Sequence, residues 1–316
     1  MANLRYGVIG TGGLGGYYGG RLAYSGQDVH FLLNSDYEYV RMNGLRIDSV
    51  NGDFRLDQVS AYQATTDMPG CDVLLVCLKT THNHLLPAML PPVVHPGSVV
   101  IMIQNGLGIE EELDHRMPHL NIAGGLAFIG AGKKGPGHIT HLDLGSLVIG
   151  GYNLKTIKIL QQVCDDFQGA GVPCSISENL DASRWQKLVW NVPFNGMSVV
   201  LNTTTDQIVS NPSTRQLALE MMLEVIHAAN HCGVPMKEGL AFRMMEMTDG
   251  MVPYAPSMKL DYDFNRPMEI DAIYTRPAQK AAQAGFEMKA VAMLEKQLRF
   301  IEARQKLNAK TTGFKE

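Results

Sequence analysis

The sequence lacks most features that would place it outside ordinary globular proteins. Its five cysteines are scattered, odd in number and without C-x-x-C spacing, which argues against a disulfide framework or a zinc ribbon. No apolar run reaches the length of a membrane span, and no charged-then-apolar leader precedes the first predicted strand. The formal net charge of -4 argues against a nucleic-acid or anionic-membrane partner. We therefore expect a cytoplasmic protein that binds neither nucleic acid nor membrane.

Patterns of metal ligands are also scarce. His227 and His231 have the i, i+4 spacing of one helix face, and His82 and His84 lie close in sequence, but neither pair has a third ligand nearby. The 18 methionines are typical of adaptable core packing. We predict no metal site. At 316 residues the chain is long enough for two domains.

A glycine-rich segment near the N-terminus carries the clearest functional signal. Gly10, Gly12 and Gly15 have G-x-G-x-x-G spacing, follow the apolar segment 6–9, and precede a helix of small residues predicted over 17–25. The first glycine permits a tight turn, the second lets a pyrophosphate approach, and the third lets the helix pack closely on the strand. The segment, with Thr11, Gly13 and Leu14, predicts a dinucleotide site, although a glycine turn without a ligand is the alternative.

The end of the second predicted strand leaves the choice of cofactor open. An acidic residue there favours NAD, whereas a basic residue accommodates the 2′-phosphate of NADP. The strand predicted over 28–33 is followed by Asn34, Ser35 and Asp36. Asn34 and Ser35 can bond either cofactor, and Asp36 can point away.

Polar residues follow two further apolar strands of the predicted sheet. Lys79 comes after the strand over 72–78, and Asn105 comes after the strand over 98–103. Ligands of open parallel sheets bind beyond the carboxyl ends of the strands. We therefore predict that Lys79 and Asn105 contact the cofactor, against the alternatives of a solvated lysine and an Asn-Gly turn.

The remaining sequence predicts the domain organisation. Alternation and turn residues over 43–57 suggest a hairpin, and strands are predicted over 121–128, 138–142 and 146–149, with glycine-rich turns between them. An amphipathic helix over 154–169 and a short strand over 172–176 follow. Helical periodicity dominates from about residue 179. We predict an α/β domain with a mostly parallel sheet over residues 1–178 and an all-α domain over 179–316.

The first helix of the second domain carries a polar stripe. Lys187, Asn191 and Asn195 have i, i+4, i+8 spacing among bulky apolar residues, which makes full exposure of this face difficult. Pro193 predicts a kink or an end of this helix, with Asn195 beyond the bend. The segment 256–259 is predicted to be an irregular turn, and a further helix is predicted to begin near Glu269.

Together these elements resemble the ketopantoate reductase (2-dehydropantoate 2-reductase) family over nearly the whole chain. The order and spacing of the motifs make the resemblance more specific than the glycine segment alone. It implies a Rossmann domain, a helical domain, a cleft between them, and NADPH-dependent reduction of 2-dehydropantoate to (R)-pantoate in pantothenate biosynthesis. The matching motifs are Gly10 to Gly15, Val76-Cys77-Leu78-Lys79-Thr80, Gln104-Asn105-Gly106, Lys187 with Asn191 and Asn195, Pro256-Ser257-Met258 and Glu269-Ile270-Asp271.

The resemblance also implies roles for individual residues. Lys187 matches the catalytic lysine, and Glu269 matches an acidic residue near the cofactor and active site. Asn191, Asn195 and Ser257 match substrate-binding positions, while Lys79 and Asn105 match cofactor contacts. Asn34 stands where many members have an arginine for the 2′-phosphate, so NADP(H) is expected and NAD(H) stays open.

Reaction chemistry favours the same residues. Hydride addition to a ketone places negative charge on oxygen, which an ammonium such as Lys187 stabilises and protonates, and a carboxylate such as Glu269 orients that ammonium. Two alternatives stay open: a related NAD(P)-dependent reductase of another 2-oxo acid, and a dinucleotide-binding sensor without chemistry. The oligomeric state is also open, a homodimer included.

Overall fold

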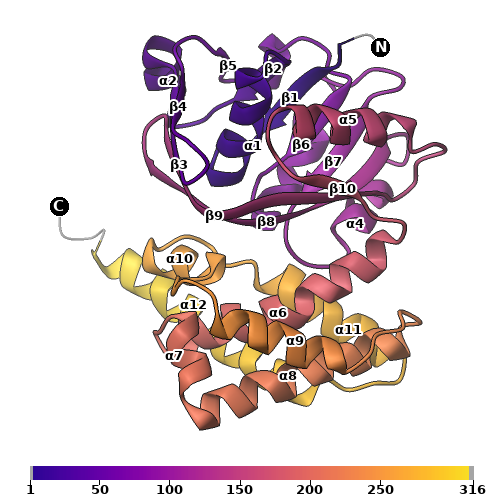
Figure 1. The fold of residues 1–316 in the computed structure, drawn as a ribbon, viewed down its shortest axis with the longest axis vertical. Coiled ribbons are helices and arrows are strands. Elements are labelled where there is room, and N and C mark those ends of the chain that lie inside the picture. The colour runs from indigo at the N-terminus through magenta and orange to yellow at the C-terminus, as the bar shows by residue number, and fades with distance from the viewer. Residues whose placement is uncertain (1–2, 313–316) are drawn as a thin grey trace. The chain divides into compact units, whose positions relative to one another are not determined.

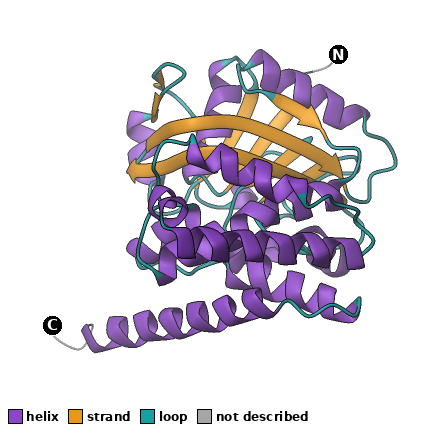
Figure 2. Ribbon diagram, turned by 60° about the horizontal axis from the view of Figure 1, so that its bottom comes forward, coloured by secondary structure: helices purple, strands orange, loops and turns teal. Residues whose placement is uncertain are grey.

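The computed structural model describes residues 3–312, which separate into two compact units. Unit 1 comprises residues 1–104 and 109–180, and unit 2 comprises residues 105–108 and 181–316. Strands belong to unit 1, and unit 2 is built from helices (Figures 1 and 2). The predicted class, an α/β Rossmann domain followed by an all-α domain, is confirmed.

The sheet of unit 1 is mostly parallel, in the order β4-β3-β9-β8-β7-β6-β1-β2-β5, with β10 on β9. Its central strands β1, β6 and β7 are almost wholly buried, as expected for a parallel sheet covered on both faces. The strands are β1 (Arg5–Ile9), β2 (Asp28–Leu32), β3 (Leu45–Ser49), β4 (Phe54–Leu56), β5 (Ser60–Tyr62), β6 (Val73–Val76), β7 (Val99–Ile103), β8 (Asn121–Gly135), β9 (His138–Gly151) and β10 (Cys174–Ile176).

The predicted strands over 121–128, 138–142 and 146–149 are corrected by the structure. They form two long antiparallel strands, β8 and β9, joined by a tight turn. Gly130, Gly132 and Gly145, taken as turn residues, lie inside the strands, whereas Gly137 lies in the turn between them. Register shifts occur at Phe128/Ile129 and Gly130/Ala131, and Leu144 and Gly145 have φ values of 60° and 118° near the first of them. Bulges of this kind bend a strand without ending it, so the glycines near these bulges do not mark the ends of β8 or β9.

Helix α1 packs closely against the sheet because one of its faces consists of glycine. A Cβ on Gly19 would lie 2.6 Å from Val8 and 2.7 Å from Phe31, so a larger side chain would push the helix away. The helical elements of unit 1 are α1 (Gly13–Tyr24), α2 (Tyr37–Asn43), α3 (Leu86–Met89), α4 (Ile109–Arg116), α5 (Lys158–Gly169) and the short 3₁₀ turns η1 (Thr65–Asp67) and η2 (Thr80–Leu85).

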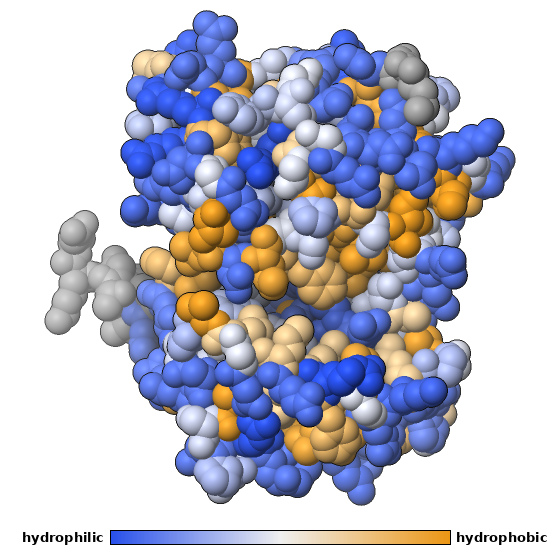
Figure 3. All heavy atoms as spheres, in the orientation of Figure 1, coloured by the Kyte–Doolittle hydropathy of each residue, from blue (hydrophilic) through white to orange (hydrophobic). Residues whose placement is uncertain are grey.

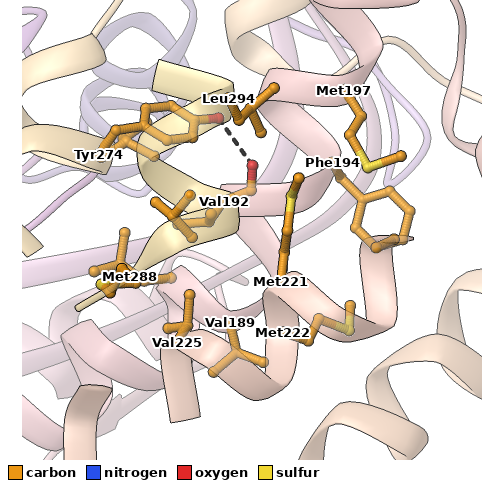
Figure 4. Close-up of a cluster of buried hydrophobic side chains, with 14 of the residues drawn as sticks. Val189, Val192, Phe194, Met197, Met221, Met222, Val225, Tyr274, Met288 and Leu294 are labelled. Atoms are coloured by element: carbon orange, nitrogen blue, oxygen red, sulfur yellow. Dashed lines mark hydrogen bonds between the residues drawn. The ribbon is translucent and has the colours of Figure 1, made fainter. Parts of the chain in front are cut away.

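Unit 2 packs its helices around a core rich in valine and methionine (Figure 4). Trp185, Phe194 and Tyr274 are fully buried in it, and burying each such aromatic side chain contributes about 2–3 kcal/mol. Its elements are α6 (Leu180–Val200), α7 (Thr205–Ser210), α8 (Pro212–His231), α9 (Gly239–Asp249), α10 (Ser257–Asp263), the π-helical turn η3 (Asp271–Thr275), α11 (Arg276–Gln283) and the long α12 (Lys289–Thr312).

The surface of each unit carries many hydrophilic residues on the face drawn in Figure 3. Within residues 3–312, no helix has the length and apolar character needed to cross a membrane. The same residues hold no group of three or more histidine, cysteine, aspartate or glutamate side chains arranged to bind a metal ion.

Candidate active site

The turn from Gly10 to Gly15, called the cradle below, packs against other protein atoms at Gly10 and Gly15 and borders open space at Gly12. Gly10 has φ of +98°, and a Cβ there would lie 2.8 Å from the Leu78 amide. A Cβ on Gly15 would overlap the Gly10 carbonyl oxygen. A Cβ on Gly12, in contrast, would meet no atom within 4 Å. Two glycines therefore serve the packing of the turn, and Gly12 borders open space, as the second glycine of a dinucleotide-binding turn would.

The helix after this turn begins without a side-chain cap. Gly12 is the N-cap of α1 and contributes no side-chain hydrogen bond, so the first N–H groups and the positive end of the helix dipole suit an anion. The Thr11 hydroxyl donates to the Leu32 carbonyl at 2.9 Å and so ties the turn to the end of β2. A Cβ on Gly13 would lie 3.0 Å from the Ala131 carbonyl oxygen, because β8 passes close by.

A buried amide pair supports the segment that carries Lys79. The Gln104 amide donates to Asn83 Oδ1 at 2.7 Å and to the Leu78 carbonyl at 2.7 Å, and the Asn83 amide donates back to Gln104 Oε1 at 3.1 Å. Lys79 follows Leu78 directly and is half-buried at the start of η2. The amide pair thus links the ends of β6 and β7 and fixes the backbone from which Lys79 extends.

The turn after β2 places Asn34 and Asp36, whose roles the sequence left open, in different surroundings. Asn34 and Ser35 are exposed, and Asn34 accepts a backbone hydrogen bond from Tyr37 at 3.2 Å. Asp36 is only 6% exposed, and its carboxylate is held by other groups of unit 1. The acid near the end of β2 is therefore turned away from the exposed position that Asn34 occupies.

Lys187 of α6 is a half-buried ammonium with an altered pKa. Its removal from water, reinforced by the positive charge of Arg184, lowers the pKa of Lys187 to about 7, while Glu269 opposes this change. An ordinary lysine side chain has a pKa of about 10.4, so Lys187 loses its proton more readily than an exposed lysine does. A pKa near neutrality suits a group that donates a proton and recovers it in each cycle.

Arg184 is a second buried cation near Lys187 that no sequence motif indicates. It is 3% exposed and lies three residues before Lys187, on the same face of α6. The i, i+3 spacing of the two cations was visible in the sequence, but only burial makes their mutual repulsion large enough to matter.

The two asparagines of the stripe have different surroundings. Asn195 is buried, and its Oδ1 accepts from the Met258 N–H at 3.1 Å and from the Ser257 hydroxyl at 3.4 Å. Asn191 is 6% exposed, and its side-chain amide makes no hydrogen bond within the part of the chain that the structure describes. The amide atoms of Asn191 are not among the fully buried polar atoms that lack a partner, so they stay accessible to a polar ligand group. Ser257 begins α10, so the predicted irregular turn over 256–259 is wrong.

Pro193 does not end α6, which continues as an α-helix to Val200. The proline removes one helical N–H, and a side chain from another element joins the helix nearby. The Tyr274 hydroxyl donates to the Val192 carbonyl at 2.9 Å (Figure 4). The same hydroxyl accepts from the Gly196 N–H. It thus contacts both groups that pair in a regular helix. A Cβ on Gly196 would lie 2.6 Å from this hydroxyl.

The segment after Glu269 joins several of the candidate residues. Glu269 is 3% exposed and precedes the π-helical turn η3, a form of helix that often accompanies functional sites. The Ala272 carbonyl of this turn accepts from the Leu107 N–H at 2.9 Å, and Arg276 donates to the Gly108 carbonyl at 3.0 Å. Asn105 therefore belongs to unit 2 with Lys187 and Glu269.

Comparisons with known proteins match both parts of the chain to one family. Residues 6–153 match the model of the family described as ketopantoate reductase PanE/ApbA, and residues 179–302 match that of its C-terminal part. The chain belongs to the ketopantoate reductase family. A curated 2-dehydropantoate 2-reductase of Nostoc is 45% identical over 311 residues, which cover 97% of this chain and 98% of the relative. As a member of this family, the protein is an oxidoreductase acting on a CH–OH group.

Solved structures extend the likeness. The crystal structure of 2-dehydropantoate 2-reductase from Geobacter metallireducens matches with a TM-score of 0.91 and 39% identity, covering 94% of this chain and 99% of that one. A D-mandelate dehydrogenase solved with NADH shares the fold with a TM-score of 0.89 and 18% identity, covering 96% of this chain and 99% of that one.

Proposed function

We propose that the protein catalyses the NADPH-dependent reduction of 2-dehydropantoate to (R)-pantoate in pantothenate biosynthesis, on the route to coenzyme A. The observation that carries this proposal is Lys187, an ammonium with a pKa near 7 beside Glu269 and on the same helix face as Asn191. The name and 45% identity of the Nostoc relative support the choice of substrate. We assign residues 1–178 to cofactor binding and residues 179–316 to substrate binding and catalysis.

The cradle fits the pyrophosphate of such a cofactor. Gly12 leaves space for it, and the uncapped start of α1, with Thr11, Gly13 and Leu14 around it, supplies N–H donors. Lys79 adds a cation at the end of β6, and Asn105 adds an amide after β7. When bound, the nicotinamide supplies a hydride to the C2 carbonyl carbon of the oxo acid.

Lys187 and Glu269 handle the proton of the reaction. As the carbonyl oxygen gains negative charge, the Lys187 ammonium stabilises it and then transfers a proton from Nζ to that oxygen. The product is an alcohol, and the neutral amine left on Lys187 recovers a proton from solvent. Glu269 favours the charged form of Lys187 and so opposes the effects of burial and of Arg184.

Three residues hold the substrate during this step. The unpaired amide of Asn191 is available to the carboxylate or hydroxyl of the oxo acid. The Asn195 amide nitrogen and the Ser257 hydroxyl lie together, because Ser257 bonds to the Asn195 oxygen. The two amides donate and the Ser257 hydroxyl oxygen accepts, so these neutral groups bind a substrate without adding charge that would shift the pKa of Lys187 further.

We further propose that NADPH is preferred over NADH, that the protein acts in the cytoplasm, and that it forms a homodimer. The position after β2 holds no exposed acid that would repel a 2′-phosphate, because Asn34 occupies it. The scattered cysteines suit a reducing compartment.

The proposed homodimer is supported by the surface of α12. Exposed apolar side chains of this helix recur every seven residues, at Met293, Phe300 and Leu307, as in a face that packs against a second helix.

An oxidation assay tests the proposed function. Purified protein is mixed with NADPH or NADH and with 2-dehydropantoate or a panel of other branched 2-oxo acids, and loss of absorbance by the reduced cofactor is followed. We expect the highest kcat/KM with NADPH and 2-dehydropantoate. A clearly higher kcat/KM with another 2-oxo acid would make that acid the substrate in place of 2-dehydropantoate. Binding of the cofactor without turnover of any acid would favour a sensor. Light scattering gives the oligomeric state.

A further inference from the structure

The carboxylate of Asp36 is removed from solvent by a set of partners within unit 1. Lys133 Nζ lies 2.5 Å from its Oδ1, the Ser35 hydroxyl donates to the same oxygen at 3.2 Å, and the Gly137 N–H donates to Oδ2 at 3.1 Å. Asp36 follows β2, the strand whose end contacts the adenosine ribose in dinucleotide-binding folds. An acid at this place would ordinarily bind the ribose hydroxyls and repel a 2′-phosphate.

Lys133 comes from a distant part of the sequence, the far half of β8. This strand also passes the start of α1, because a Cβ on Gly13 would touch the Ala131 carbonyl oxygen. The same strand thus borders the pyrophosphate cradle with Ala131 and reaches the turn after β2 with Lys133. The Lys133 side chain is 31% exposed, so its ammonium pairs with Asp36 while one side stays open to solvent.

We propose that Lys133 is the specificity residue that takes the 2′-phosphate of NADPH, with Asp36 holding it at the end of β2; this inference rests on the proposed function. The ammonium has three donors and needs one for Asp36, which leaves donors for a phosphate. Pairing also cancels the negative charge of Asp36 as seen by the cofactor. The lysine from β8 thus supplies the cation that the position of Asn34 lacks.

The proposal predicts an order of cofactor preference set by local charge. Lys133→Met leaves the Asp36 carboxylate without a cation and should lower the NADPH over NADH affinity ratio about fivefold, the scale of a partly exposed ion contact. Asp36→Asn frees Lys133 and should raise the ratio severalfold. The double variant restores zero local charge and should lie between the two single variants. Lys133→Arg keeps the cation and should stay close to the original protein.

Titration of the full-length protein measures these ratios without turnover. Dissociation constants are determined for NADPH and NADH, and for 2′,5′-ADP and 5′-AMP as probes of the adenosine half, at low and high salt. Lys134→Met is the matched control, because it removes a neighbouring exposed charge from the same strand. We expect the ratio to change with Lys133 and not with Lys134, and the change to shrink at high salt.

Two results overturn the inference and stay distinct from failure of the proposed function. An unchanged NADPH over NADH ratio in Lys133→Met, with a normal melting temperature, excludes Lys133 from phosphate binding. Equal changes in Lys133→Met and Lys134→Met reduce the effect to general surface charge. The proposed function fails separately, if the original protein binds neither NADPH nor NADH or reduces no 2-oxo acid.

Discussion

The cradle of unit 1 and the polar cluster of unit 2 are built by opposite means. The cradle is local and consists of backbone: Gly10, Gly12 and Gly15 lie within one turn, and their function is the absence of side chains. The cluster consists of Lys187, Asn191 and Asn195 of α6, Ser257 of α10 and Glu269 before η3, which only the tertiary fold brings into one unit. Changes in the first should therefore alter cofactor affinity, and changes in the second should alter turnover and substrate binding.

The largest effect is expected in unit 2, at Lys187. Lys187→Ala should lower kcat by about two to four orders of magnitude, the range of a positioned acid or oxyanion donor. The dissociation constant for NADPH should change little if the two regions work separately. Steady-state kinetics with a parallel NADPH titration measure both. A normal kcat with a raised KM would instead make Lys187 a binding residue for the substrate carboxylate.

A pair of glycine variants sharpens the contrast within the cradle. Gly12→Val adds a side chain in open space, so the fold should persist while NADPH affinity falls about 100-fold or more. Gly15→Ala places a methyl group against the Gly10 carbonyl, so stability should fall by about 1–3 kcal/mol. Thermal melting and NADPH titration separate the two effects. A folded Gly12→Val protein with unchanged affinity would contradict the cofactor assignment.

Glu269→Gln should have an intermediate effect, about a tenfold loss of kcat at pH 7. Glu269 raises the pKa of Lys187, so its loss should lower that pKa further and leave fewer molecules protonated. Asp271→Asn is the control, since Asp271 is an exposed carboxylate on the same segment that pairs with Arg299. Combining Glu269→Gln with Lys187→Ala should cost little more than Lys187→Ala alone. Fully additive losses would mean that the two residues act independently.

The smallest effect is expected at Tyr274, which touches α6 beside the asparagines. Tyr274→Phe should cost about 1–2 kcal/mol of stability and raise KM for the oxo acid a fewfold, because the helix between Asn191 and Asn195 loses a fixed contact. Tyr18→Phe is the matched control, since it removes an equally buried bond from a phenol to the Ser146 carbonyl in unit 1. Similar KM values in both variants would limit Tyr274 to a stabilising role.

The same contrast explains what could be predicted from the sequence. The cradle, the hydrophobic strands and the stripe of α6 depend on local spacing, so the sequence predicted them. The sequence did not predict contacts that only the fold creates, which are Arg184 beside Lys187, Lys133 beside Asp36, and Tyr274 at Pro193. The lowered pKa of Lys187 was not predicted for the same reason, because it comes from burial and from neighbouring charges that a local sequence pattern does not reveal.

The pH dependence of kcat/KM tests the central claim, proton donation by Lys187, most directly. A pKa near 7 means that the ammonium is lost as pH rises through neutrality. With NADPH saturating, log kcat/KM for the oxo acid should be level at low pH and fall with a slope of -1 above about pH 7, and Lys187→Ala should lack this step. A profile in the original protein that stays flat to about pH 9 would contradict the claim.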